Sequence, residues 1–370
     1  MRTANPLFAL MLLAASGSAL AAPARQECLG RMIFQVPGEI SWSTYDLLNG
    51  KYLDVGDQGF SPNVATSFDS MLYDQDGLRI FVSGKADLKD MVRLKNMERG
   101  THYLTSKKLA KHVEAMRFVL DVARKWNYSA EEIAVIKADL HGYEHELMLS
   151  QEHEHDLGFA DTKAIGTQEF PTKAFLWRQQ RIYTFSLQDP KPGAGERLKD
   201  LISRFEPRAL YEIPKGPGIC LPYGFIRDDG KTHFEFKYSL RLENNKNVIV
   251  GLINASANNP WHSQPAFGTV NDYLPTYDFS RLVKRDVQQP LSLGGTPTTF
   301  SGWRLDPRPH SEGTERLWYG FAHRGGSSEP LVAVQVHTVR QGIDDIKSVT
   351  PPPEEIMPRI SELSRSISHQ

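Results

Sequence analysis

The sequence predicts an α+β fold of two domains, each a mainly antiparallel β-sheet backed by helices. Short runs that alternate apolar and polar residues recur along the chain between clusters of turn-forming residues, and this pattern is typical of antiparallel strands. Fewer segments repeat apolar residues every three or four positions, which indicates amphipathic helices. A length of 370 residues is more than a single domain usually contains, so we expect two domains.

The first 21 residues predict an export signal. Arg2 is their only charged side chain, residues 7–15 form an apolar run, and residues 19–21 supply the small side chains found at cleavage sites. The apolar run is far shorter than the roughly 20 residues needed to cross a bilayer. We therefore predict a cleaved signal peptide at 1–21, a periplasmic mature chain and no stable membrane insertion.

The charge balance argues against a nucleic-acid partner. Lys and Arg number 43 and Asp and Glu number 44, so the net charge is close to zero. A protein that binds nucleic acid usually carries a strongly basic surface. We therefore expect no nucleic-acid partner.

Two cysteines, Cys28 and Cys220, are the whole thiol content of the chain. In an oxidising periplasm such a pair is a candidate disulfide, the alternative being two separate buried thiols. Neither position suits a metal site or a redox C-x-x-C motif.

The N-terminal domain, residues 22–206, is expected to mix strands with helices. Alternation at period two predicts the strand at 31–36, aromatic and β-branched residues predict the strand pair at 174–187, and spacings of three and four predict the helices. Ser129 and Glu132 form a capping box that starts a second helix. The predicted elements are a strand at 31–36, a hairpin around Asp76-Gly77, a helix at 106–126, a shorter helix from Ser129, a strand pair at 174–187 and a helix at 195–205.

Residues 139–150 contain HGYEH, which fits the H-x-x-E-H zinc pattern of the inverted zincin metalloproteases. On a helix, His141 and His145 could both ligate zinc while Glu144 activates a bound water. Gly142 would destabilise a helix by about 1 kcal/mol relative to alanine, and we interpret the segment as a strand. Glu144 would then point away from both histidines. We predict no metal site, with a metal-dependent hydrolase as the alternative.

Residues 207–218 are rich in Pro and Gly and predict a linker before a C-terminal domain at 219–370. This domain is expected to begin with a hairpin around Asp229-Gly230. Further strands are predicted at 248–256, 316–324 and 330–339, followed by a terminal helix at 353–367.

Enzyme signatures are missing from the sequence. It contains no G-x-S-x-G nucleophile elbow, no phosphate-binding G-x-x-x-x-G-K and no G-x-G-x-x-G after a strand. No residue is nominated as a nucleophile with a base. We predict a protein that is not an enzyme and that uses no cofactor.

Aromatic residues placed among turn formers are candidate contacts for a protein partner. Trp261 and Phe267 lie in INASANNPWHSQPAFG, and Trp303 lies in FSGWRLDPRPHSEG. Large rings exposed on loops are typical binding hot spots. The alternatives are that each ring packs under its own loop, or that the loops bind carbohydrate or another envelope component.

Three segments taken in order resemble one known family. They are CLGRMIFQVP near the predicted mature start, HGYEHEL in the middle and GICLPYGFIRDDG at the second domain. This layout resembles the two-domain lipase-cognate immunity proteins, which protect bacteria against phospholipase effectors of the type VI secretion system. The resemblance implies a periplasmic, non-catalytic protein without a cofactor, whose partner is a phospholipase effector. It assigns no catalytic residue and no contact residue.

Overall fold

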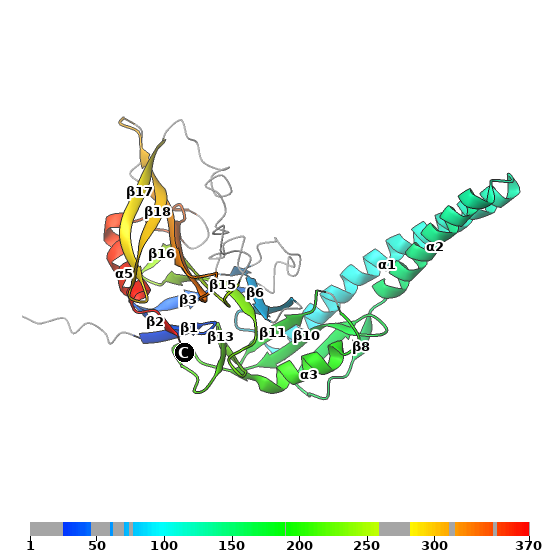
Figure 1. Cartoon of the computed structure of the whole chain (residues 1–370), viewed down its shortest axis with the longest axis horizontal. Helices are drawn as coiled ribbons and strands as arrows, with labels where there is room; N and C mark the ends of the chain where they lie inside the picture. Colours follow the sequence, from blue (N-terminus) through cyan, green and yellow to red (C-terminus); the bar gives the residue numbers. More distant parts are fainter. Residues whose placement is uncertain are drawn as a thin grey trace, which may run out of the picture.

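A computed structural model gives the chain an α+β fold in which strands form the body and two long helices project from it as a hairpin (Figure 1). The predicted α+β class is therefore confirmed. The structure describes residues 25–45, 60–61, 70–73, 77–188, 190–258, 282–310, 315–342 and 346–369.

A 13-stranded antiparallel sheet is the largest element among the described residues. Strands from both ends of the chain meet in it, because β6 pairs with β15. Its order is β17 (Leu282–Leu293), β18 (Thr296–Pro307), β19 (Leu317–Arg324), β20 (Leu331–Thr338), β16 (Asn245–Ala255), β15 (Phe234–Leu242), β6 (Ser70–Tyr73), β7 (Leu78–Val82), β11 (Arg181–Ser186), β10 (Pro171–Arg178), β9 (Thr162–Gly166) and β8 (His153–His155), with β3 (Ile40–Trp42) beside β15.

Smaller sheets and four helices complete the described part of the chain. The sheets are β1 (Arg25–Leu29) with β2 (Met32–Val36) and β21 (Ser368–His369), β12 (Phe205–Pro207) with β14 (Gly224–Arg227) and β13 (Gly218–Leu221), and β4 (Thr44–Tyr45) with β5 (Phe60–Ser61). The helices are α1 (Leu88–Lys125), α2 (Ala130–Ser150), α3 (Ala194–Arg204) and α5 (Pro353–Arg365).

One hydrophobic cluster joins the two halves of the body. It contains Phe34 and Phe185 from the N-terminal half and Tyr238, Phe300 and Ile360 from the C-terminal half, all nearly inaccessible to solvent. Burial of apolar surface on this scale is the main force that stabilises a fold. The division into domains at 22–206 and 219–370, with a linker at 207–218, stays a prediction.

Most of the predicted strands and helices are confirmed, because their local patterns agree with their packing. The turn between β10 and β11 is made by Gln179 and Gln180, whose φ angles of 46° and 58° suit a tight hairpin. The confirmed elements are the strand at 31–36, the hairpin at Asp76-Gly77 through the pairing of β6 with β7, the strand pair at 174–187, the strands at 248–256, 316–324 and 330–339, and the helices at 195–205 and 353–367.

The predicted hairpin at Asp229-Gly230 is wrong. β14 pairs with β12 and β13, whereas the following β15 pairs with β16, β6 and β3. The hairpin lies one strand earlier, where Tyr223 adopts a φ of 59° between β13 and β14. Asp228 then turns the chain away, since its carboxylate accepts from the Gly230 amide at 2.7 Å and pairs with Arg31 at 3.0 Å.

The strand interpretation of residues 139–150 is also wrong, because they form the second half of α2. The predicted capping box at Ser129 and Glu132 is present and starts the helix. Packing along α1 outweighs the helix penalty of Gly142, whose missing side chain would point into open space. Tertiary contact therefore decides the conformation of this segment.

Candidate partner-binding surface

The helical hairpin α1–α2, residues 88–150, is called the arm. α1 begins 18 residues before the predicted helix at 106–126, at a capping box formed by Asp87 and Asp90. Its first turns are fixed to the sheet, because Met91 and Leu94 are buried against Phe175 and Ile182. The arm is therefore anchored at its base and extends freely beyond it (Figure 1).

Polar contacts fix the base of the arm further. Lys173 of β10 lies 2.7 Å from Glu98 of α1, and Lys95 lies 2.5 Å from Glu154 of β8. Both lysines are largely buried in these pairs. Burial raises the pKa of Glu152, which lies 3.2 Å from Arg99. These pairs hold α1 to the edge of the sheet.

Beyond the base, α1 and α2 stabilise each other. Val113, Leu120 and Ala123 of α1 recur at helical spacing and are buried although this part of α1 projects from the body. The rings of His112 and Tyr143 stack at 5.7 Å between centroids across the hairpin. The apolar side of α1 that the sequence predicts therefore packs against α2.

The arm also exposes large apolar side chains. Among the described residues, eleven of the twelve such side chains lie between 88 and 149. Tyr103, Leu104 and Phe118 of α1 are 63%, 67% and 69% exposed, and Trp126 at the tip is 73% exposed. Concentrated apolar exposure on one element marks an interaction surface, whereas scattered exposure is ordinary.

The outer face of α1 is defined as the exposed residues Tyr103, Leu104, Lys107, Lys108, Lys111, Glu114 and Phe118. At 100° per residue these positions share one side of the helix, opposite Val113 and Leu120. The Lys107 ammonium lies 6.0 Å from the centroid of the Tyr103 ring. The outer face is the candidate binding surface.

The outer face of α1 is not among the surfaces predicted from the sequence, although the sequence contains a signal for it. The helix prediction for 106–126 rests on the apolar residues that pack against α2, and it leaves Phe118 unexplained on the opposite side. An aromatic residue on the polar side of an amphipathic helix is the signal that could have found the outer face.

The three aromatic residues predicted as partner contacts do not lie together in the described structure. Trp261 and Phe267 lie outside the described residues. Trp303 lies in β18 and is 5% exposed, with its ring stacked on Tyr319 at 5.8 Å. It packs with Leu305 in a small cluster. The prediction that Trp303 lies in an exposed loop is wrong, because FSGWRL lies inside β18, where Trp303 is paired with Asp286 of β17 and Tyr319 of β19.

The H-x-x-E-H residues lie together on α2 but do not assemble a zinc site. His141 and His145 are one turn apart and exposed. The Glu144 carboxylate lies 2.7 Å from Arg117 of α1, so it belongs to the contact between the two helices. In the described part of the chain, no group of three or more His, Cys, Asp or Glu side chains could hold a metal ion.

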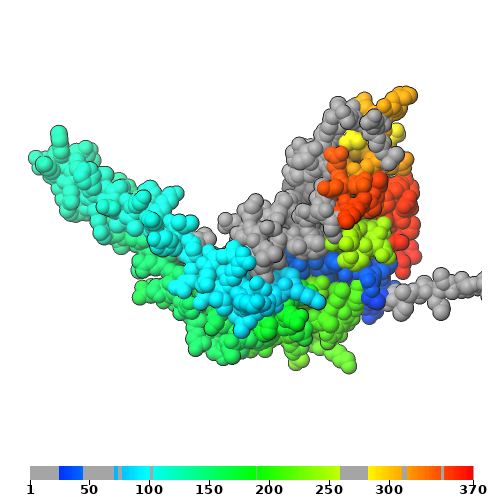
Figure 2. All heavy atoms as spheres, turned by 180° about the vertical axis from the view of Figure 1, so that it is seen from behind, coloured from blue at the N-terminus to red at the C-terminus, as the bar shows by residue number. Residues whose placement is uncertain are grey.

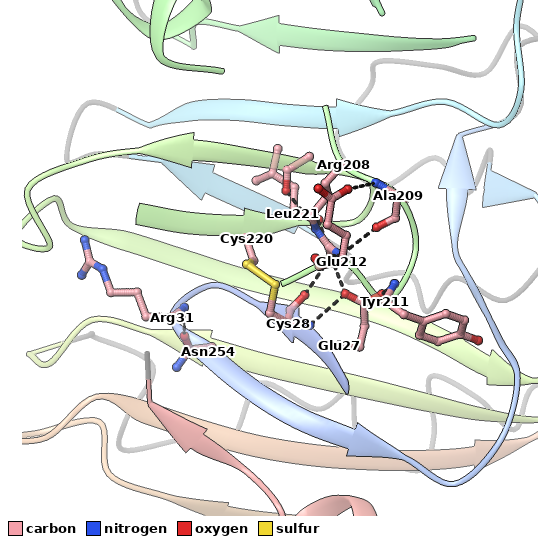
Figure 3. Close-up of a disulfide and its surroundings, with 11 residues drawn as sticks. Glu27, Cys28, Arg31, Arg208, Ala209, Tyr211, Glu212, Cys220, Leu221 and Asn254 are labelled. Carbon is pink, nitrogen blue, oxygen red and sulfur yellow. Dashed lines mark hydrogen bonds and ion pairs between the residues drawn. A yellow bond between two sulfur atoms is a disulfide. The ribbon is translucent and has the colours of Figure 1, made fainter. Parts of the chain in front are cut away.

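The predicted disulfide between Cys28 and Cys220 is present (Figure 3). The two Cα atoms are 5.7 Å apart, and the bond joins positions 192 residues apart in the sequence. Both cysteines are inaccessible to solvent and pack on Phe225. Gly30 and Cys220 exchange backbone hydrogen bonds of 2.9 and 2.8 Å beside the bond. The disulfide therefore joins β1 to β13 inside the body.

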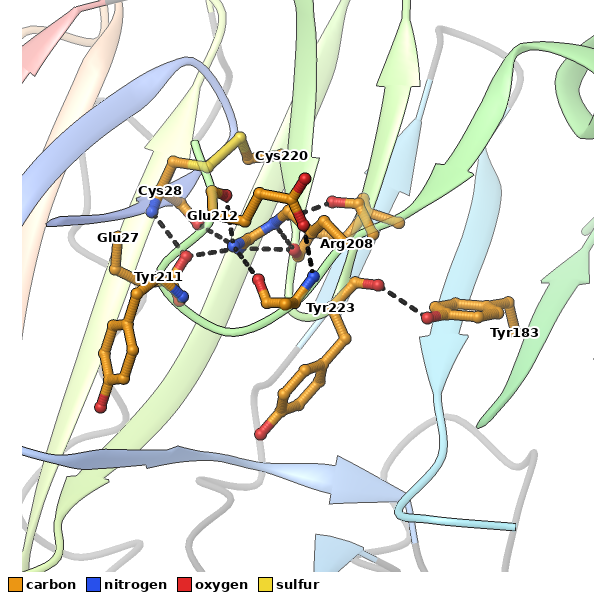
Figure 4. Close-up of polar contacts among 11 residues, drawn as sticks. Glu27, Cys28, Tyr183, Arg208, Tyr211, Glu212, Cys220 and Tyr223 are labelled. Carbon is orange, nitrogen blue, oxygen red and sulfur yellow. Dashed lines mark hydrogen bonds and ion pairs between the residues drawn. A yellow bond between two sulfur atoms is a disulfide. The ribbon is translucent and has the colours of Figure 1, made fainter. Parts of the chain in front are cut away.

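A buried ion pair lies beside the disulfide (Figure 4). The Glu27 carboxylate lies 2.5 Å from the Arg208 guanidinium and accepts from the backbone amides of Cys28 and Tyr211. Arg208 donates to several backbone carbonyls, including that of Leu221 at 2.9 Å. Both charged side chains are thus nearly inaccessible to solvent and hydrogen-bonded.

Tyr183 of β11 extends this group of contacts to the 13-stranded sheet. The Tyr183 hydroxyl donates to the Tyr223 carbonyl at 2.6 Å (Figure 4), and burial raises the pKa of Tyr183. Arg181 lies over the Tyr223 ring at 3.5 Å from its centroid. We call the disulfide, the Glu27–Arg208 pair and these tyrosines the junction.

No helix in the described residues has the length and apolar character to span a membrane. The sequence matches no family model and no curated protein.

Several solved structures are similar to the chain. One is the immunity protein TplEi of the type VI secretion system of Pseudomonas aeruginosa in complex with the "L" peptide, at a TM-score of 0.46 and 12% identity, covering 94% of this chain and 99% of that chain. Apo TplEi gives 0.43 and 13%, covering 94% and 97%. A chain of the Tle4–Tli4 complex gives 0.45 and 13%, covering 94% and 97%.

Proposed function

We propose that the chain is a periplasmic immunity protein that binds and neutralises a phospholipase effector of the type VI secretion system without catalysis of its own. The observation that carries the proposal is the arm, on which most of the exposed large apolar side chains of the described residues are gathered. The sequence resemblance in CLGRMIFQVP, HGYEHEL and GICLPYGFIRDDG supplies the kind of partner.

An inhibitor that protects by binding requires a rigid surface. Rigid presentation reduces the entropy that is lost when a complex forms. The arm meets this requirement, because buried residues and ion pairs fix its base while packing between α1 and α2 holds its length.

The disulfide supports the proposed compartment. Disulfides persist in oxidising environments such as the periplasm and are rare where thiols are kept reduced. The bond between Cys28 and Cys220 therefore fits the export signal predicted at 1–21. Residues 1–24 lie outside the described part of the chain.

The alternative of a metal-dependent hydrolase receives less support. In that chemistry Glu144 would have to face a metal-bound water beside His141 and His145. Its carboxylate instead contacts the Arg117 guanidinium across the arm. The motif therefore contributes to helix pairing.

The proposal is tested by coexpression with the phospholipase encoded beside the gene, directed to the periplasm. Cells that make the enzyme alone should lyse, and cells that also make this chain should survive. The two proteins should copurify in equal amounts, and the complex should no longer hydrolyse phospholipid vesicles. A variant lacking residues 1–21 should not protect.

Two outcomes would contradict the proposal. One is survival without a complex, and the other is absence of protection by the exported chain. A metal-dependent hydrolysis of peptide or ester by the purified chain would support the hydrolase instead.

A further inference from the structure

The outer face of α1 combines large apolar side chains with positive charge. Lys107, Lys108 and Lys111 lie along the helix between the pair Tyr103 and Leu104 at one end and Phe118 at the other. At a rise of 1.5 Å per residue, Tyr103 and Phe118 are roughly 22 Å apart along the helix. This length matches the width of a standard protein interface of about 800 Å² per side. Figure 2 shows from behind that the arm extends well beyond the body.

The charges of the two helices are opposite. α1 contains ten Lys and Arg against four Asp and Glu, whereas α2 contains one against five. Lys108 and Lys111 have no carboxylate partner among the described residues. The positive charge of the outer face is thus directed outward and attracts an acidic surface.

A second copy of this chain does not fit the outer face. A twofold dimer places the same surface of both copies in contact. The outer face carries three lysines and one glutamate, so two copies of it would bring surfaces of the same net charge together, and like charges across an interface oppose binding. α2 lies on the opposite side of α1, so its acidic side chains are directed elsewhere.

A lipid surface also fits poorly. Helices that lie on a membrane bury a continuous apolar face and keep their charges on the other side. On the outer face, the charged residues Lys107, Lys108, Lys111 and Glu114 separate Tyr103 and Leu104 from Phe118, so no continuous apolar face is present. The continuous apolar side of α1 is instead buried against α2. Separate apolar anchors with charged side chains beside them suit a protein interface, in which buried hot spots are surrounded by a polar rim.

From these observations we infer that the outer face of α1 is the docking site for the phospholipase effector, which offers apolar pockets rimmed by acidic side chains. The inference rests on the proposed function for the identity of the partner. Phe118, Tyr103 and Leu104 are the apolar anchors. Lys107, Lys108 and Lys111 favour a partner whose pockets are surrounded by acidic side chains.

The test uses the full mature chain and the purified phospholipase encoded beside its gene, with affinity and rates measured by biolayer interferometry. Phe118→Ala should weaken binding at least 30-fold, mainly through faster dissociation. Lys111→Glu should slow association at least threefold and reduce the dependence of the association rate on salt. Both side chains are exposed, so melting temperatures should stay unchanged.

Two matched controls report on other surfaces. Val349→Ala removes an exposed apolar side chain of the body, and Lys137→Glu reverses a charge on α2. Both should leave the dissociation constant within about twofold, as expected for exposed positions outside the interface.

Four outcomes would overturn the inference. If the wild type does not bind the phospholipase, the proposed function fails and the docking site fails with it. If the wild type binds and the Phe118 and Lys111 variants bind equally well, only the docking site fails. A wild-type dimer that Phe118→Ala dissociates would assign the face to a second copy. Flotation with anionic phospholipid vesicles that Phe118→Ala abolishes would assign it to lipid.

Discussion

The junction buries charged side chains, whereas the arm exposes large apolar side chains. At the junction, the charges of Glu27 and Arg208 are taken out of water and held 2.5 Å apart, next to the disulfide. In the arm, Phe118 and Tyr103 are left in water although apolar burial would stabilise the fold. Both arrangements contribute less to stability than well-packed apolar burial at the same positions would.

This difference indicates that the junction stabilises the fold and that the arm provides the binding surface. The junction connects β1 with β13 through one covalent bond and one ion pair, so changes there should be measured as lost stability. The outer face of α1 contributes little to the fold, so changes there should be measured as lost binding.

Arg208→Met should cause the largest loss of stability. It leaves the Glu27 carboxylate buried without its counter-charge, which costs about 3 to 5 kcal/mol of unfolding free energy. Urea unfolding at pH 7 measures the loss. Phe118→Ala in the arm is the matched comparison, and it should change the unfolding free energy by less than about 0.5 kcal/mol.

The double variant Glu27→Gln with Arg208→Met separates charge from packing. Removing both charges should be less destabilising than Arg208→Met alone, because no unpaired charge remains buried. Equal stability of the two variants would show that the hydrogen bonds of Arg208 to backbone carbonyls, and not its charge, hold the junction.

Replacing Cys28 and Cys220 by alanine should have the next largest effect. The disulfide closes a loop of almost 200 residues, and loss of such a bond costs about 2 to 4 kcal/mol. The unreduced wild type should be lighter than the reduced chain by the two thiol protons in a mass spectrum. Reductant should lower the melting temperature of the wild type and leave that of the variant unchanged.

The sequence predicts those strands and helices whose own residues show the pattern of the element. β2 alternates buried side chains with partly or fully exposed ones, so its period of two is visible in the sequence. β10 and β11 are buried on both faces, and their aromatic and β-branched residues indicate strands instead. Residues 139–150 are different, because their helix depends on packing against α1, which is distant in sequence. The local sequence shows the helix-destabilising Gly142, but it does not show the contact with α1 that stabilises the helix.

The Glu27–Arg208 pair could not be found from the sequence. The two residues are far apart in the chain, and neither has neighbours that differ from those of an ordinary surface charge. The pairing of Cys28 with Cys220 could be predicted, because they are the two cysteines of a chain whose sequence predicts export. Trp303 was misplaced, because the Pro and Gly around it suggested a loop where β18 runs as a strand.

His337 in β20 should make the body sensitive to acid. Burial lowers its pKa from 6.5 to about 3, and Lys237 contributes in the same direction. Between pH 6.5 and 3 the unfolded chain therefore binds a proton that the folded chain does not, so stability falls as the pH is lowered. The expected loss from this group between pH 7 and pH 5 is about 2 kcal/mol.

Chemical unfolding at the two pH values measures this loss. His337→Gln should remove most of it, whereas His145→Gln on the exposed side of α2 should not. If His337→Gln unfolds with the same pH dependence as the wild type, other groups cause the acid sensitivity.

The double variant His141→Ala with His145→Ala should show the smallest effect. Both side chains are exposed on α2, so the unfolding free energy should change by less than about 0.5 kcal/mol. Glu144 keeps its contact with Arg117 in this variant, and the pairing of the two helices should persist in the circular dichroism spectrum. Metal analysis of the purified wild type should find less than one zinc per chain, and protection against the phospholipase should be the same for variant and wild type. Equimolar zinc that is lost in the variant, together with a loss of protection, would instead make the arm a metal site and assign α2 the role that we propose for the outer face of α1.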